Sequence, residues 1–564
     1  MVIPHRSAIF QLSHNYVSDY MALSPLLSTI SGISGNDHRI DDFSQDGFNA
    51  IANLMKTTLE KLASLDPLDD IDRIAQRMMQ ERLNVSLKLL ESGEWQIGWN
   101  VVASPPSMIR MAIDLMPRET ETEIANLTAR FSSLPTAYDL WFSEINRLAK
   151  EGKVTAKRQV LGVVAQLEIF GNGGCSSIAS EIDPHRRNVS LQSAAIRADE
   201  SSLETARKLR DEYLPLASSI DAFGRERYAR WTHFYLGAEL NLRETYDHAM
   251  GEFESANVQI WPLAREILPT AQSLLEVVEF LDRDPHYQIE GVDEWLVKLK
   301  SLTEEAFKAI EGVYFDIPKE IRECDVRLAP EGSSVPAYYT PPSEDFSRPG
   351  VTWYSTLGKN SFNWWRTPLI SHHESVPGHH LQMAKLAYEG DRLSRFQRTE
   401  FMEGYGEGWA TYAEDFMNEI GAYEEPALKF AFLLSKLGKN ALILIDIGLH
   451  LGYEDTFGQV WTAESAKIFL EERTLVEKVR AERAVNRCLG FPGQFLCYQV
   501  GKNFWSKVRQ DAQERLGSNF ELHKFHTHAL ALGSMGLDQF VQEMSRWDGN
   551  LPGSSINRLM SIDE

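Results

Sequence analysis

Residues 371–382 read SHHESVPGHHLQ, and this stretch carries four of the chain's 15 histidines within nine positions. A zinc hydrolase needs two neutral imidazoles on one metal and a nearby carboxylate that takes a proton from water. The usual pattern is H-E-x-x-H, because residues i and i+4 share one helix face. Here Glu374 follows His373, but the fourth residue after His373 is Pro377 and the next histidine is His379, at i+6. The pattern therefore predicts a metal site only if the helix is interrupted.

The Pro-Gly pair between the two histidines supplies such an interruption. On an unbroken helix, side chains six residues apart diverge by about 120° and lie about 9 Å apart along the axis. They would not reach one ion at about 2.0–2.1 Å. Pro377 has no N–H for the carbonyl of His373 and clashes with that turn, and Gly378 allows backbone angles that other residues avoid. We therefore expect the helix to unwind so that His379 returns to the metal; the alternative is a polar turn with incidental histidines.

Two neighbouring histidines have alternative roles. His380 stands at i+7 from His373 and is the rival second ligand. His372 is expected either to support the site from behind or to be exposed.

A third ligand is expected to be a carboxylate from a neighbouring helix. Residues 401–416 read FMEGYGEGWATYAEDF and have helical spacing from Glu407 onward. Glu407 is the preferred ligand, Glu403 is its alternative, and Glu414 is a candidate for orienting a ligand. The glycines in this segment allow close approach of another backbone.

These motifs resemble those of the bacterial proteins catalogued as domain of unknown function 885 (DUF885), which look like distant relatives of zinc peptidases. The resemblance is carried by HESVPGHHLQ (373–382), EGWATYAE (407–414), AERAVNRCLGFPGQFLCYQVG (481–501) and FHTHALALG (525–533). It implies that His373, His379 and Glu407 bind Zn²⁺, that Glu374 is the general base, and, by analogy, that the activity is peptidase activity. Cys497 departs from the family, which often has a small hydroxyl residue there.

Two further side chains are candidates for the site. Tyr498 follows the PGQ segment at 492–494, and its phenol O–H would stabilise the negative charge that develops on a carbonyl oxygen; the alternative is a core tyrosine. His526 belongs to the last histidine cluster and would line the cleft, unless it is a helix-surface or capping residue. Arg483 and Arg487 are weaker candidates for holding a peptide carboxylate.

Most of the first 330 residues carry helical periodicity, with apolar residues three and four apart between charged faces. The expected helices include 120–130 and 137–150. Between about 328 and 349 the chain is rich in Pro, Gly and Ser, which predicts an ordered loop. The loop leads into Val351–Ser355 (VTWYS), the best strand candidate of this half.

The expected fold is mostly α, a large helical zinc-peptidase-like fold with a small β-sheet next to the active-site cleft. Two parts are expected, a helical amino-terminal part at 1–330 and a catalytic metal-binding part at 331–564, joined as one continuous body.

Composition narrows the class of partner. The 564 residues carry a formal charge of −23, which disfavours nucleic acid and anionic membranes. The most apolar stretch, Phe430–Leu451, is interrupted by Lys436, Lys439 and Asp446, so it predicts a buried helix rather than a membrane span. Four cysteines without C-x-x-C spacing and a start without a signal-peptide pattern predict a cytoplasmic protein.

The sequence thus predicts a zinc-dependent hydrolase whose Glu374 takes a proton from water and returns it to the leaving amine, with Tyr498 polarising the carbonyl. The expected substrate is a peptide or small amide, and the VTWYS strand is expected to pair with an extended peptide. The alternatives are a zinc hydrolase of a non-peptide amide or ester, and a catalytically inactive binding protein. Another divalent metal suits the same donors, and no oligomeric state is predicted.

Overall fold

The computed structural model describes residues 6–330, 335–343 and 346–551, which form two compact units. Unit 1 comprises Met1–Trp231, Leu449–Leu451 and Glu482–Pro492. Unit 2 comprises Thr232–Gly448, Gly452–Ala481 and Gly493–Glu564. The main division therefore follows Trp231 and differs from the boundary expected near residue 330. The physical reason is that the strands on both sides of residue 330 belong to one sheet, which a domain boundary would divide.

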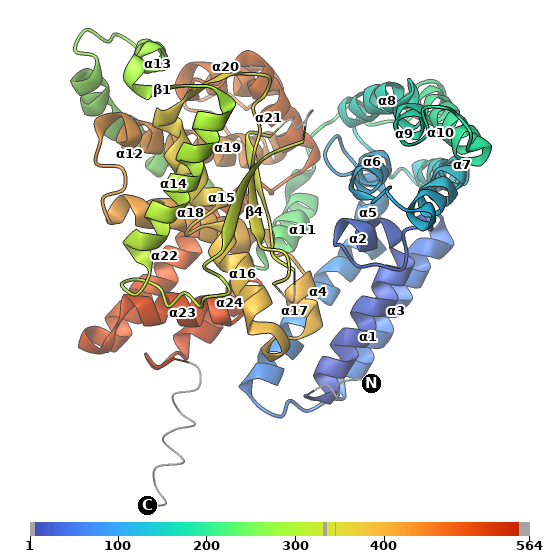
Figure 1. Cartoon of the computed structure of the whole chain (residues 1–564), viewed down its shortest axis with the longest axis horizontal. Helices are drawn as coiled ribbons and strands as arrows, with labels where there is room; N and C mark the ends of the chain where they lie inside the picture. Colours follow the sequence, from blue (N-terminus) through green and yellow to red (C-terminus); the bar gives the residue numbers. More distant parts are fainter. Residues whose placement is uncertain (1–5, 331–334, 344–345, 552–564) are drawn as a thin grey trace, which may run out of the picture. The chain divides into compact units, whose positions relative to one another are not determined.

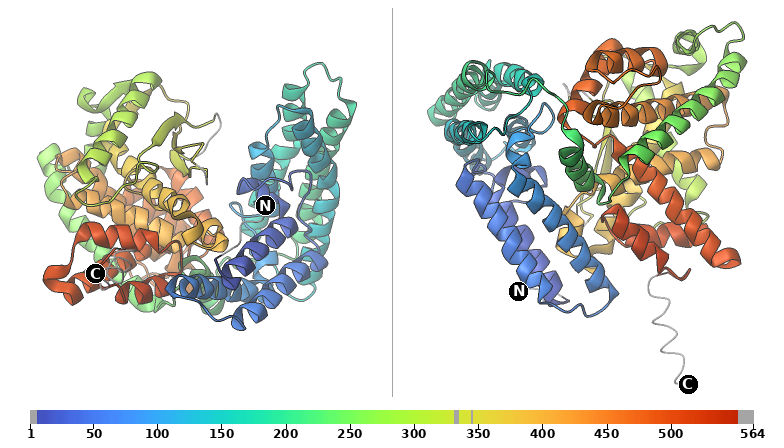
Figure 2. Two further views of the ribbon diagram at one scale, coloured as in Figure 1. Left: turned by 60° about the horizontal axis from the view of Figure 1, so that its bottom comes forward. Right: turned by 180° about the vertical axis from the view of Figure 1, so that it is seen from behind.

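Helices are the main regular elements among the described residues of unit 1. Its complete helices are α1 (Ala8–Leu23), α2 (Pro25–Ile30), α3 (Gln45–Ala63), α4 (Asp70–Ser92), α5 (Glu94–Ile97), α6 (Pro105–Leu115), α7 (Glu121–Ala149), α8 (Lys157–Gly171), α9 (Gly174–Ile182) and α10 (Val189–Lys208). Helices α1, α3 and α4 lie side by side, and α10 packs against α7 and α8 (Figures 1 and 2). One apolar core contains buried side chains from α6, α7, α8, α9 and α10.

Helix α7 includes both segments that were expected to be separate helices, because the helix continues through Pro135. A proline inside a helix removes one backbone hydrogen bond and costs about 3 kcal/mol. Phe131 and Leu134, which flank the missing bond, are completely buried in the core of unit 1. Burial of a large apolar side chain contributes roughly 1.5–3 kcal/mol, so packing outweighs the local cost.

Unit 2 holds most of the remaining elements. Its helices are α12 (Leu242–Ile267), α13 (Leu274–Arg283), α14 (Val292–Ile310), α15 (Thr367–Glu374), α16 (His379–Glu389), α17 (Arg395–Thr399), α18 (Glu403–Glu419), α20 (Ala463–Thr474), α22 (Leu496–Leu516), α23 (Leu522–Ala531) and α24 (Leu537–Ser545). Three helices continue across the division: α11 (Gly224–Leu236), α19 (Pro426–Leu451) and α21 (Lys478–Gly490).

A three-stranded sheet in unit 2 has the order β2-β4-β3. The central strand β4 (Gly350–Tyr354) pairs in parallel with β2 (Cys324–Leu328) and antiparallel with β3 (Ala337–Thr340). The strand expected at 351–355 is confirmed. The expectation that it pairs with a peptide substrate is wrong, because both of its edges already carry a strand.

Strand β3 also interrupts the expected loop, of which residues 331–334 and 344–345 lie outside the described part of the chain. A second sheet pairs β1 (Gln288–Glu290) with β5 (Ser361–Asn363). Trp295 of α14 stacks on Phe362 of β5 with ring centroids 3.9 Å apart, which fixes this two-stranded sheet to the helix.

The fold is therefore mostly α with small sheets, as expected. Helix α19 contains the whole apolar stretch that was expected to be a buried helix. Among the described helices, none combines the length and apolarity needed to cross a bilayer.

Candidate metal centre

The helix is interrupted exactly between the two histidines of the first motif. Helix α15 ends at Glu374, directly after His373, and α16 begins at His379. Gly378 has φ −67° and ψ −126°, which are not helical backbone angles. A Cβ at Gly378 would lie 1.8 Å from the carbonyl oxygen of His373. The break that Pro377 and Gly378 predict is therefore confirmed, and glycine is required at its second position.

Trp409 of α18 holds this interrupted turn in place. Its indole N–H donates to the carbonyls of Pro377 and Gly378, both at 3.0 Å, and the side chain is completely buried. The turn between the two histidines is thereby fixed to the helix that carries Glu407. The sequence pattern indicated Trp409 only as part of an apolar stripe; its place two residues after a candidate ligand was the available signal.

Close packing of α18 against α22 brings Tyr498 to the same place. A Cβ added to Gly408 would lie 2.6 Å from the carbonyl carbon of Gly501, so only glycine permits this approach of the two helices. The ring of Tyr498, near the start of α22, lies nearly parallel to that of His373, with centroids 6.2 Å apart. Tyr498 therefore lies beside the first histidine, as a site residue would.

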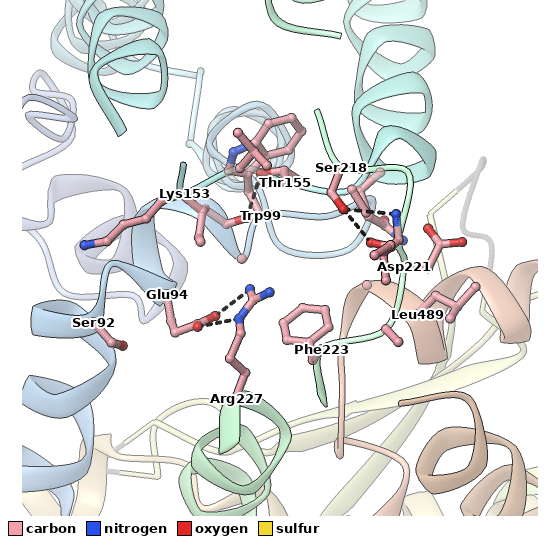
Figure 3. Close-up of a pocket in the computed structure, with 18 of the residues that line it drawn as sticks. Ser92, Glu94, Trp99, Lys153, Thr155, Ser218, Asp221, Phe223, Arg227 and Leu489 are labelled. Atoms are coloured by element: carbon pink, nitrogen blue, oxygen red, sulfur yellow. Dashed lines mark hydrogen bonds and ion pairs between the residues drawn. The ribbon is translucent and has the colours of Figure 1, made fainter. Parts of the chain in front are cut away.

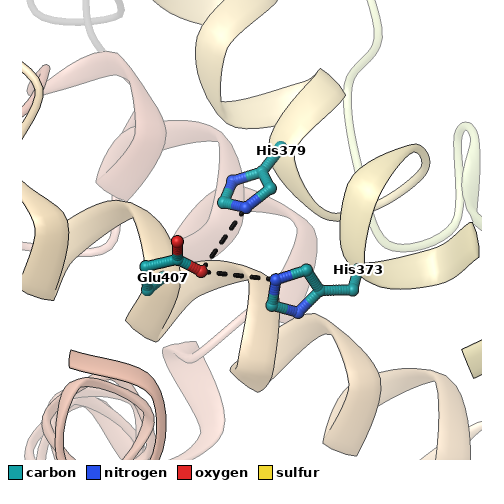
Figure 4. Close-up of side chains that lie close together, drawn as sticks. All are labelled: His373, His379 and Glu407. Carbon is teal, nitrogen blue, oxygen red and sulfur yellow. Dashed lines mark ion pairs between the residues drawn. The ribbon is translucent and has the colours of Figure 1, made fainter. Parts of the chain in front are cut away.

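His373, His379 and Glu407 meet at one point (Figure 4). Nε2 of His373 and Nε2 of His379 lie 3.3 and 3.5 Å from Oε2 of Glu407. Ligand atoms bound tetrahedrally to one zinc at about 2.0–2.2 Å are about 3.3–3.6 Å apart. The Oε2 atom is also buried without a well-formed hydrogen bond to any described residue. Two imidazoles and a carboxylate are a known donor set of catalytic zinc, so the residues present fit this ion.

The electrostatics of the cluster favour a cation. Burial lowers the pKa of His373, but the nearby carboxylates of Glu407 and Glu414 outweigh it and raise the pKa to about 10. Burial raises the pKa of Glu407, but the two histidines outweigh it and hold the pKa well below its usual value. The carboxylates thus stabilise positive charge at the Nε2 side of His373, where a divalent ion would take the place of a proton.

Glu374, the expected base, closes α15 beside this cluster. Burial raises its pKa, while the charges of His373 and His379 oppose that effect. The interaction with both histidines places the Glu374 carboxyl in the electrostatic field of the three candidate ligands.

A buried ion pair orients His373 from behind. Its Nδ1 lies 2.7 Å from Oε1 of Glu414, and Lys439 of α19 forms an ion pair with the other oxygen of that carboxylate. This contact places Glu414 where the expected orienting role requires it. Lys439 was missed as a site residue, although it is one of the charges that interrupt the most apolar stretch of the chain.

The two neighbouring histidines point elsewhere. Nδ1 and Nε2 of His380 lie 2.9 Å from the Tyr339 hydroxyl and 2.7 Å from the carbonyl oxygen of Ile321. His372 is buried with Nδ1 2.8 Å from the hydroxyl of Tyr423. His380 has no ring nitrogen left for a metal, so the rival assignment is not supported; His372 is buried rather than exposed.

The structure does not bring His526 to the cluster, contrary to expectation. Its Nε2 lies 2.8 Å from the hydroxyl of Tyr412 and its Nδ1 lies 3.1 Å from the carbonyl oxygen of Tyr314. The ring stacks on Phe315 at 4.4 Å and is completely buried. Because both nitrogens are bonded to the protein and the ring is sealed in an aromatic cluster, we withdraw His526 from the candidate catalytic residues.

The remaining alternatives also lie outside the cluster. Oε2 of Glu403 accepts a hydrogen bond from Gln494 at 2.8 Å. Arg483 and Arg487 belong to unit 1, whereas the three candidate ligands belong to unit 2.

Comparison with known proteins places this fold. The model of a family described as "Bacterial protein of unknown function (DUF885)" matches residues 25–544. The chain belongs to the DUF885 family. The family match includes all three candidate ligands and Glu374.

Two solved structures share the fold of this DUF885 protein. "The putative lipoprotein from Colwellia psychrerythraea" superposes with a TM-score of 0.82 at 20% identity, over 96% of this chain and 98% of that one. A "putative lipoprotein of unknown function from Shewanella oneidensis" gives a TM-score of 0.76 at 18% identity, over 95% of this chain and 100% of that one. No curated protein matches the sequence.

Proposed function

We propose that this DUF885 protein is a zinc-dependent hydrolase that cleaves peptide bonds of small or extended peptides. The proposal is carried by one observation: two imidazole nitrogens lie 3.3 and 3.5 Å from a single buried carboxylate oxygen. This is the spacing of ligands around a tetrahedral zinc. Three protein ligands leave a fourth position for water or substrate, which distinguishes catalytic from structural zinc.

The chain's own residues have complementary roles in this proposal. A bound zinc ion acidifies water and polarises the substrate carbonyl. Glu374 accepts a proton from water and later donates it to the leaving amine, and its burial makes it a stronger base than an exposed carboxylate. The hydroxyl of Tyr498 donates a hydrogen bond to the carbonyl oxygen as negative charge develops there. The Glu414–Lys439 pair keeps the imidazole of His373 in one orientation.

Peptides are favoured over other substrates by this combination of groups. Amide cleavage requires a proton for a poor leaving group, which Glu374 supplies, and stabilisation of an oxyanion, which Tyr498 supplies. We also propose, on the same grounds, that the fold around α15, α16 and α18 is that of a distant zinc peptidase.

Incubation of the zinc-loaded full chain with a mixture of unblocked and end-blocked peptides, followed by mass spectrometry, tests the proposal. Cleavage is expected with the unaltered protein and not with Glu374→Gln, which should keep its zinc. Glu424→Gln, the same substitution at an exposed carboxylate, is the matched control and should cleave normally. Cleavage of simple esters or non-peptide amides alone, or unchanged peptide cleavage by Glu374→Gln, would contradict the proposal.

A further inference from the structure

A cavity lies entirely within unit 1. It encloses about 440 Å³, within the range of sites that hold small organic molecules. Its walls come from the start of α5, the segment 152–156, the segment 218–223, α11 and the end of α21 (Figure 3). None of the candidate zinc ligands lines it. Nothing in the proposed hydrolysis uses this cavity.

A guanidinium group is held rigidly in the wall of this cavity. Arg227 donates through Nε and Nη2 to the two carboxylate oxygens of Glu94, at 2.6 and 2.9 Å, and its guanidinium lies 4.2 Å from the ring centre of Phe223. Glu94 is 2% exposed and also accepts from the indole N–H of Trp231 at 3.2 Å. The pair therefore fixes the guanidinium plane, while Nη1 of Arg227 takes no part in the bonds to Glu94 (Figure 3).

The charges that line the cavity favour an anion. The cavity is lined by three cations, Lys153, Arg227 and Arg230, and by two carboxylates, Glu94 and Asp221. Glu94 is shared by both arginines and lies 3.5 Å from Arg230. Lys153 lies 3.9 Å from Glu151, which does not line the cavity. Asp221 is already paired at 3.0 Å with an arginine that does not line the cavity. The Nε atom of Arg230 is buried without a hydrogen-bond partner among the described residues. The chain as a whole has a formal charge of −23. The local excess of cationic donors in the cavity has the opposite sign and attracts small anions.

The size and the rest of the lining indicate more than an inorganic ion. One water takes up about 30 Å³ of liquid volume. On that scale, the volume of the cavity is several times the volume of a phosphate or sulfate ion. Trp99, Phe223 and Leu489 contribute aromatic and aliphatic surface. An anionic head near the arginines with an apolar body along these side chains would use both parts of the wall.

From this combination we propose that the unit 1 cavity is a binding site for a small organic anion, with a carboxylate or phosphate head group and an apolar body. Guanidinium groups bind both head groups through paired hydrogen bonds. The head group lies against Arg227, Arg230 and Lys153.

Titration calorimetry of the full chain with benzoate, phenyl phosphate and the uncharged benzamide tests this site. Both anions are expected to bind at least about tenfold more tightly than benzamide, because a charge-assisted hydrogen bond contributes more than a factor of ten. The ratio between the two anions distinguishes a carboxylate ligand from a phosphate ligand. Saturation by neither anion, or equal binding of benzamide, would overturn the proposal.

Variants locate the binding. Arg230→Gln and Lys153→Gln should each weaken anion binding, Arg230→Gln by about tenfold, and both side chains are partly exposed, so folding should be preserved. Lys157→Gln removes the same charge from an exposed position outside the cavity and should change affinity less than about twofold. Binding that survives Arg230→Gln but is lost in His379→Ala would place the anion at the metal centre and overturn the proposal.

Discussion

Two groups of histidines in unit 2 differ in what their ring nitrogens contact. In the metal cluster, the Nε2 atoms of His373 and His379 face one carboxylate oxygen that lacks a well-formed hydrogen bond. In the other group, His380 and His526 have both nitrogens close to hydroxyl or carbonyl groups of the protein. Buried polar atoms are nearly always satisfied, so the convergence of incompletely satisfied atoms distinguishes the candidate ligands from the other histidines. Histidine density in the sequence does not make this distinction.

The difference between the two groups is tested most sharply by replacing one histidine of each, His379 and His380, in separate variants. His379→Ala should lose the zinc of the native protein, expected at about one ion per chain, because two ligands do not retain a catalytic zinc. His380→Ala should keep the metal and lose thermal stability instead, since it removes bonds to Tyr339 and Ile321. Elemental analysis of both variants gives the metal content. Retention of zinc by His379→Ala together with its loss from His380→Ala would reverse the assignment.

Glu374→Gln separates catalysis from metal binding. Loss of a general base typically costs about 10²–10⁴ in rate, and peptide cleavage should fall by that factor in kcat. Zinc content should stay unchanged, because Glu374 is not among the three converging groups. A variant with unaltered kcat would refute the role of the carboxylate as a base.

Lys439→Met tests the support behind His373. The lysine neutralises Glu414, which orients the imidazole, and loss of such outer contacts typically weakens metal binding about 10–100-fold. Competition with a zinc chelator measures the affinity. The matched control is Lys436→Met, one turn earlier on α19, whose lysine pairs instead with Glu252 at 3.6 Å; its zinc affinity should be close to native. Equal losses in the two variants would show that the effect is general.

The smallest effect concerns the sealed histidines. Burial lowers the pKa of His526 from 6.5 to about 3, so the unfolded chain binds the extra proton first as pH falls. Its contribution to stability is complete above about pH 6.5 and is lost progressively as pH falls toward 3. Between pH 7 and 5.5 the loss is about 1 kcal/mol.

His526→Phe should therefore be less stable at pH 7, through loss of the bonds to Tyr412 and Tyr314, yet show a flatter pH dependence by about that amount. Urea unfolding at the two pH values gives the free energies. An unchanged slope would mean that His526 is protonated equally in the folded and unfolded chains.

The features that the sequence predicted correctly depend on local chemistry. Proline at 377 and glycine at 378 are adjacent and both disfavour continuation of the helix, so the turn before His379 was predictable. Strand β4 followed from its short β-branched and aromatic run. The family motifs were confirmed by a match over most of the chain.

The features that were missed depend on tertiary packing. Helices were expected separately at 120–130 and 137–150, but core burial on both sides of Pro135 keeps α7 continuous. The two edges of β4 are filled by β2 and β3, which both precede it in the sequence, and its own composition does not reveal this pairing. Trp409 and Lys439 act through contacts with segments far along the chain. His526 was misassigned because spacing alone does not show which partners a ring nitrogen meets.

Crystals of the full chain grown with zinc, with diffraction measured on both sides of the zinc absorption edge, test the central claim most directly. We predict one strong anomalous peak at about 2.0–2.2 Å from Nε2 of His373, Nε2 of His379 and an oxygen of Glu407. A peak bound elsewhere, or no peak between these three side chains in zinc-saturated crystals, would contradict the assignment of the metal centre.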